Sequence, residues 1–145
     1  MTTSPSSAPS SDLTRVRTAA DAAGWLRHRC GQYVANAENE PSQVHARALR
    51  KTALTLHVLA ATLDREGGDD VAAADSLMRL ARSYRQTHRA DLPDPKSADY
   101  QLACAHLADT LRAVGARLTH ATAPERTARA GLRSSQEVTR HGRDL

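Results

Sequence analysis

Seven histidines and two cysteines are the side chains in this 145-residue chain best suited to metal binding or nucleophilic chemistry. They are His28, His45, His57, His88, His106, His120 and His141, with Cys30 and Cys104. Their spacing matches no zinc-ligand pattern, since the chain has neither His-Glu-x-x-His nor Cys-x-x-Cys. Cys104 and His106 would point about 200° apart on a helix, so the two side chains cannot share one ion. We therefore predict no metal site and no cofactor, and we expect both cysteines to be small buried side chains.

Catalytic groups are equally hard to assemble from this sequence. A di-iron bundle needs Glu-x-x-His pairs that project inward, whereas Glu38, Glu40, Glu66 and Glu125 all fall near expected helix ends. The chain has no Gly-x-Ser-x-Gly elbow and no glycine-rich phosphate loop. We predict no catalytic residue. A helical enzyme or ligand-binding bundle, with a site that one sequence does not reveal, is kept as an alternative that ranks below the two functions given at the end of this subsection.

Arginines form two regular stripes that are candidate partner-binding surfaces. The stripes are Arg82, Arg85 and Arg89 in the third expected helix, and Arg126, Arg129 and Arg133 near the C-terminus. In each stripe the positions recur at i, i+3 and i+7, which places the side chains on one side of a helix. Both stripes also suit a solvated helix face. The functional interpretation of the first is a docking face for an acidic partner helix, a nucleotide or a phosphate. Of the two, the C-terminal stripe is the one favoured for partner binding, because its segment has little else to hold it.

Trp25 is the only tryptophan, and it lies beside the expected apolar seam of its helix rather than on it. Burial at a helix–helix flank and a role as an interface anchor both suit such a residue, and it is kept as a candidate partner-binding residue. Val44, Leu54 and Val58 give the second expected helix another apolar edge outside its seam. This edge suits either the interior of a bundle or a dimer interface.

Apolar residues spaced alternately by three and four positions predict the helices that carry these side chains. The spacing is unbroken in three segments. Its residues are Val16, Ala19, Ala23, Leu26, Cys30, Tyr33 and Ala37, then Ala46, Leu49, Ala53, Leu56, Ala60 and Leu63, then Tyr100, Cys104, Leu107, Leu111, Val114 and Leu118. A weaker seam runs between the second and third of these segments. It consists of Ala73, Leu77, Leu80 and Tyr84.

Three breaks divide this pattern into four helices of similar length. They lie at residues 39–42, 67–68 and 92–95. Ser11 or Asp12 is expected to cap the first helix, Pro41 suits the first turn of the second, and Asp94 is expected to cap the fourth. Because short loops place successive helices antiparallel, we predict an all-α protein. Its architecture would be an antiparallel up-down-up-down four-helix bundle with a short, weakly docked fifth C-terminal helix.

The expected organisation has three parts. A disordered segment spans residues 1–10, the four-helix bundle spans residues 11–120, and a basic, partly helical segment spans residues 121–145. The first residues show no secretory signal, and no apolar run has the length of a membrane span. We therefore expect a cytoplasmic protein without a membrane partner.

The formal net charge of +4 is spread along the chain rather than concentrated. Residues 1–37 and 120–145 each carry +2, while residues 38–119 are balanced. A protein that neutralises about six or more phosphates usually has a denser basic surface. Arginine greatly outnumbers lysine, which indicates a GC-rich bacterial genome. The charge pattern makes nucleic-acid binding the less favoured alternative.

These observations together predict a non-enzymatic interaction or regulatory protein that acts through contacts of its helix faces. The protein is expected to self-associate as a homo-oligomer, and its partner is a protein, either a second copy of the chain or a different one. The alternative is a nucleic-acid-associated regulatory protein that uses the arginine stripes.

Overall fold

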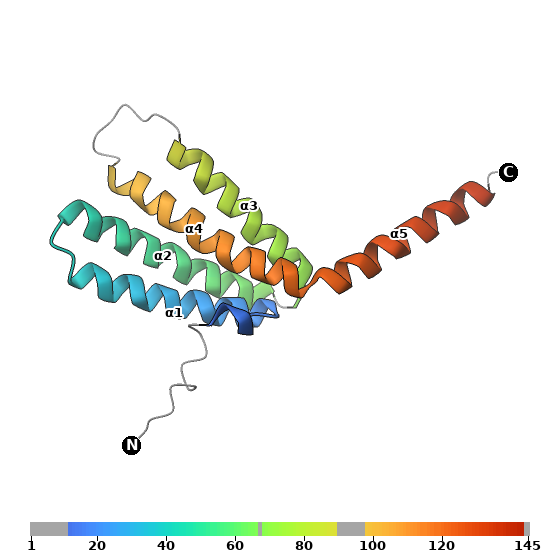
Figure 1. Cartoon of the computed structure of the whole chain (residues 1–145), viewed down its shortest axis with the longest axis horizontal. Coiled ribbons are helices and arrows are strands. Elements are labelled where there is room, and N and C mark those ends of the chain that lie inside the picture. Colours follow the sequence, from blue (N-terminus) through green and yellow to red (C-terminus); the bar gives the residue numbers. More distant parts are fainter. Residues whose placement is uncertain (1–11, 67, 90–97, 144–145) are drawn as a thin grey trace, which may run out of the picture.

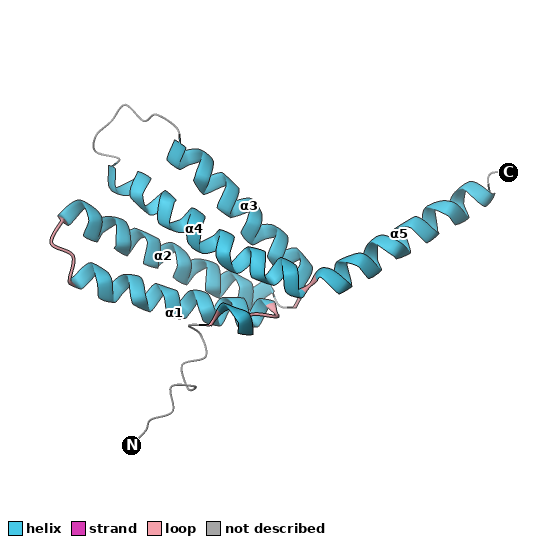
Figure 2. Ribbon diagram, viewed as in Figure 1, coloured by secondary structure: helices cyan, strands magenta, loops and turns pink. Residues whose placement is uncertain are grey.

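The structure, a computed structural model, describes residues 12–66, 68–89 and 98–143, and helix is the only regular secondary structure within them (Figures 1 and 2). No side chain is described at residues 66, 89 or 134–143. A 3₁₀ turn at Leu13–Arg15 precedes five α-helices. These are α1 (Ala19–Glu38), α2 (Gln43–Glu66), α3 (Asp70–Arg89), α4 (Ala98–Ala121) and α5 (Ala123–Arg143). The predicted all-α bundle with a C-terminal helix is confirmed.

Two antiparallel hairpins build the bundle, α1 with α2 and α3 with α4. Figure 1 shows the helices side by side in the order α1, α2, α4, α3, so the middle pair is α2 and α4. These two run in the same direction. The approach of α1 to α4 is much less close than that of α1 to α2, which leaves room for a pocket between α1 and α4.

The predicted seam forms the core. In α4 the seam residues from Cys104 to Leu118 are buried, and Leu26 in α1 and Leu56 in α2 are fully enclosed. Tyr100 is the exception: it is 46% exposed, because it lies in the first turn of α4, where the bundle ends. Burial of these apolar side chains is the main contribution to stability, at roughly 25 cal/mol per Å² removed from water.

Small residues bring α3 and α4 close together. Ala74, Ala81 and Ala108 are buried where α3 and α4 meet, and Gly115 lies against Leu77 and Met78. A Cβ at position 115 would be only 2.9 Å from Sδ of Met78. Glycine is therefore required there by the distance between the helices rather than by backbone conformation.

The first α-helix begins later than predicted. Asp12 does act as a cap, since its side chain accepts a 2.9 Å hydrogen bond from the Thr14 amide, but it caps only the 3₁₀ turn. Thr18 is the N-cap of α1: its hydroxyl accepts from the Asp21 amide at 3.1 Å, and the Asp21 carboxylate accepts from the Thr18 amide at 3.2 Å. This reciprocal capping box fixes the start of α1 at Ala19.

The other boundaries are close to the predicted ones. The second helix begins at Gln43, so Pro41 lies in the loop rather than in the first turn. Gly68 has a φ of +95°, a left-handed conformation that glycine adopts without steric cost, and it separates α2 from α3. The predicted cap at Asp94 and the predicted disordered segment 1–10 lie outside the described residues.

The C-terminal helix α5 leaves the bundle at Thr122 and extends away from it (Figure 1). Only its first turns contact the other helices. Arg126 pairs with Asp75 at 3.0 Å, and Arg129 pairs with Asp69 at 3.4 Å. These exposed ion pairs hold α5 against the start of α3. No described helix has the length and apolar character needed to cross a membrane.

Candidate functional site

The first predicted arginine stripe lies beside α4, in a shallow groove about 390 Å³ in volume. We call it the α3/α4 groove. It is lined by Met78, Ala81, Arg82, Arg85 and Gln86 of α3 and by Ala108 and Arg112 of α4. Arg82 and Arg85 are three residues apart and so lie on the same flank of α3. The side chain of Arg89 is outside the described part of the chain.

The floor of the groove is apolar and its rim is basic. Ala81 and Ala108 carry only a methyl group each, so the two helices lie close together there and Met78 fills the remaining space. Arg82 of α3 and Arg112 of α4 line the groove from different helices, and both are exposed. Sequence reasoning did not find Arg112, because its proximity to the stripe depends on how α4 aligns with α3.

The rim carries more positive charge than its carboxylates neutralise. Arg85 forms an ion pair with Asp109 of α4. Neither Arg82 nor Arg112 has an ion-pair partner among the residues that the structure describes. A guanidinium binds a carboxylate or phosphate through two parallel hydrogen bonds, so this rim is suited to an acidic group of a partner.

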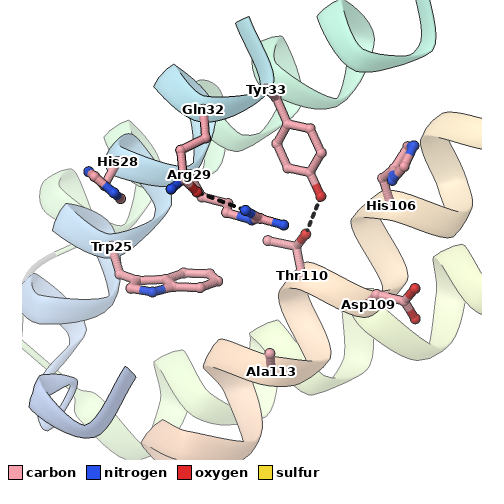
Figure 3. Close-up of a pocket in the computed structure, with 9 residues that line it drawn as sticks. All are labelled: Trp25, His28, Arg29, Gln32, Tyr33, His106, Asp109, Thr110 and Ala113. Atoms are coloured by element: carbon pink, nitrogen blue, oxygen red, sulfur yellow. Dashed lines mark hydrogen bonds between the residues drawn. The ribbon is translucent and has the colours of Figure 1, made fainter. Parts of the chain in front are cut away.

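A second hollow, about 370 Å³ in volume, lies between α1 and α4 (Figure 3). We call it the Trp25 pocket. Its lining residues are Trp25, His28, Arg29, Gln32 and Tyr33 of α1, with His106, Asp109, Thr110 and Ala113 of α4. Trp25 is only 8% exposed, so the predicted burial at a helix flank is confirmed, although the ring also lines this pocket.

Hydrogen bonds and ring contacts hold the pocket in shape. Tyr33 Oη and Thr110 Oγ1 are 2.9 Å apart and join α1 to α4. Arg29 donates from Nη1 to Oε1 of Gln32 at 2.7 Å, and its guanidinium carbon lies 4.9 Å from the centre of the Tyr33 ring. The rings of Tyr33 and His106 meet edge to face, with centroids 5.5 Å apart. Figure 3 shows the Arg29 guanidinium in the middle of the pocket, between Trp25 and Thr110.

The environment of His106 favours its neutral form. Burial is the main cause that lowers the pKa of His106 below its ordinary value, and the positive charge of Arg29 lowers it further. Asp109 acts in the opposite direction but does not reverse the shift. Arg29 is thus the fixed positive charge that reaches into the pocket.

The cysteines are not placed for nucleophilic chemistry. Cys104 is fully buried, as predicted, and Cys30 is partly buried with its thiol 3.1 Å from the carbonyl oxygen of Ala53. Both are free thiols, and burial raises the pKa of each above its ordinary value. His57 is exposed on α2. Among the described residues, no group of three His, Cys, Asp or Glu side chains is placed to hold a metal ion.

The remaining candidates have different surroundings. Arg126 contacts Asp75 of α3, and Arg129 contacts Glu125 and also Asp69, the residue before α3, while Arg133 is exposed on α5. Partner binding through this second stripe therefore stays a prediction. For the second apolar edge of α2, burial inside the bundle is wrong, because Leu54 is 65% exposed and Val58 is 51% exposed on the outer face. Its use in a dimer stays a prediction.

Comparison with known proteins gave no match to a protein family, to a curated protein or to a solved structure.

Proposed function

We propose that this protein is a non-enzymatic interaction protein that binds an acidic helical segment of a partner protein in the α3/α4 groove. The observation that carries the proposal is the convergence of Arg82, Arg85 and Arg112 around an apolar floor. Two of these three guanidinium groups have no carboxylate partner within the described chain. A partner helix that carries acidic residues on both sides of an apolar residue matches this basic rim and apolar floor.

The shape of the groove supports a helical partner. Ala81 and Ala108 keep the floor low, so one apolar side chain of a docked helix can contact Met78 while flanking carboxylates reach the rim. Acidic residues three or four positions apart lie on one face of the partner helix and can contact both rims together. Complementary charge increases specificity and the rate of association more than affinity.

The charge distribution favours a protein partner over a nucleic acid. Two arginines of α5 are already engaged: Arg126 pairs with Asp75, and Arg129 pairs with Asp69 and Glu125. The unpaired charge of the groove is confined to Arg82 and Arg112. A protein that binds duplex DNA usually neutralises about six or more phosphates.

Fluorescence anisotropy with a labelled synthetic peptide tests the proposal. The peptide would be a helix with glutamates at i, i+3 and i+7 and leucines between them, and its control would carry glutamine in place of glutamate. We expect the acidic peptide to bind, and the double variant Arg82→Gln, Arg112→Gln to weaken binding about tenfold or more, which corresponds to about 1.4 kcal/mol. The matched control, Arg17→Gln with Arg50→Gln, removes two exposed charges outside the groove, one just before α1 and one on α2, and should bind as the wild type does.

Three results would overturn the proposal. One is equal binding of the acidic and glutamine peptides, since the charge of the partner would then be irrelevant. Another is unchanged binding by the groove variant. The third is a mobility shift of a mixed-sequence DNA duplex at about 50 mM salt that the groove variant abolishes, because the basic rim would then bind phosphates.

A further inference from the structure

The Trp25 pocket combines features that the proposed function does not use. Its two walls come from α1 and α4, which approach each other much less closely than α1 and α2 do. Ala113 faces the pocket from α4, and its short side chain leaves the space opposite Trp25 open (Figure 3). At about 370 Å³ the hollow is within the usual range for a small-molecule site, which is about 300–1,000 Å³.

Arg29 gives this pocket a single fixed positive charge. Only one of its terminal nitrogens is engaged by Gln32, and no carboxylate in the described segments lies within ion-pair distance of the guanidinium. Asp109, the one carboxylate in the lining, is paired with Arg85 on the other side of α4. The remaining N–H groups of Arg29 can therefore donate to a bound anion.

Flat side chains flank this charge. The indole of Trp25 lies on one side of the Arg29 guanidinium, and the phenol of Tyr33 lies on the other (Figure 3). Aromatic faces favour stacked or edge-on contact with another ring. Tyr33 is held by its hydrogen bond to Thr110, so the ring and the charge keep a fixed relative position.

We infer that the Trp25 pocket binds a small planar aromatic monocarboxylate. The carboxylate pairs with Arg29, and the ring of the ligand lies against Trp25. One fixed cation matches one negative charge, whereas a phosphate dianion would leave the second charge without a partner in a partly enclosed site. This site is separate from the α3/α4 groove, so it does not depend on the proposed partner.

Trp25 makes the inference directly measurable, because it is the only tryptophan in the chain. Benzoate would be titrated into the full-length protein while the tryptophan is selectively excited. We expect a saturable change in fluorescence. Benzamide has the same ring without the charge, and cyclohexanecarboxylate has the charge without the planar ring. Each should bind about tenfold more weakly or worse.

Two variants locate the binding site. Arg29→Gln removes the charge, and Ala113→Leu fills the space opposite Trp25. Each should weaken benzoate binding about tenfold or more. Arg50→Gln, an exposed arginine on α2, is the matched control and should bind as the wild type does. Circular dichroism melting shows whether each variant folds, and the two blocking variants act through different atoms, so failure of one to fold leaves the other as the test.

The inference is overturned if benzoate gives no saturable response in the wild type, or if Arg29→Gln and Ala113→Leu bind it normally. It is also overturned if cyclohexanecarboxylate or inorganic phosphate binds as well as benzoate, since the site would then select charge alone. None of these results bears on the peptide experiment, which measures a different surface.

Discussion

Replacing Gly115 with alanine tests the close approach of α3 and α4. The substitution has two opposing effects on the free energy of unfolding. Alanine is preferred to glycine inside a helix by about 1 kcal/mol. Against this, the new Cβ would lie 2.9 Å from Sδ of Met78 and 3.2 Å from Cβ of Leu77. Overpacking of this kind costs about 1–3 kcal/mol. The Leu77 Cβ is attached directly to the α3 backbone, so only a shift of the helix relieves that contact. We expect net destabilisation of about 1 kcal/mol.

Gly31→Ala is the matched control. Gly31 is an exposed residue inside α1, and a Cβ there would meet no atom within 4 Å. Gly31→Ala should therefore show only the preference of a helix for alanine over glycine, which stabilises the protein by about 1 kcal/mol. The two glycine-to-alanine changes therefore have opposite expected signs.

Urea unfolding followed by circular dichroism measures both variants. With an m-value of about 2 kcal/mol per M, the midpoints should move about 0.5 M in opposite directions. In a Met78→Ala background two of the three close contacts disappear, so Gly115→Ala should destabilise the protein less than it does in the wild type. If Gly115→Ala stabilises the protein as much as Gly31→Ala does, the packing argument is wrong.

Three further outcomes are expected. Thr18→Ala removes the capping box of α1 and should cost about 1 kcal/mol of stability in urea unfolding, and no loss would contradict the assigned cap. Burial lowers the pKa of His106 in the folded state, so the contribution of neutral His106 to the free energy of unfolding is full above its ordinary pKa of 6.5 and is lost as the pH falls through the folded pKa. His106→Gln should therefore reduce the loss of stability in acid, and His57→Gln, on the exposed face of α2, should not. The double variant Arg126→Gln, Arg129→Gln should speed amide exchange at the start of α5 while leaving the unfolding midpoint of the bundle unchanged, since exposed ion pairs contribute about 0–1 kcal/mol each. Unaltered exchange there would show that other contacts hold α5.

The alternating spacing of apolar residues was sufficient to predict the helices and their buried faces. Leu26, Leu56 and Leu111 are fully buried at positions that this spacing specifies. The start of α1 was missed because the Thr18-x-x-Asp21 box carries Asp instead of the usual Glu or Gln at its third helical position. The exposure of Leu54 and Val58 was left open, because spacing alone does not say how many sides of a helix are covered.

The candidate sites were harder to predict, because each is made by two helices. The sequence revealed Arg82 and Arg85 as a stripe, but their proximity to Arg112 depends on the alignment of α3 with α4. The contacts of Tyr33 with His106 and Thr110 likewise join α1 to α4, across 73 and 77 positions of the chain. A four-residue interval between Arg29 and Tyr33 was the only local signal, and it is common on helix surfaces.

The carboxylate of Asp109 belongs to both surfaces. It lines the Trp25 pocket on one side of α4, and on the other side it pairs with Arg85 of the α3/α4 groove. An anion bound at Arg29 would change the electrostatic potential at Asp109 and hence the strength of that pair. If both surfaces bind ligands, thermodynamic linkage requires that each ligand alter the affinity of the other by the same factor. A single helix turn would thus couple a small molecule to a protein partner without any change of fold.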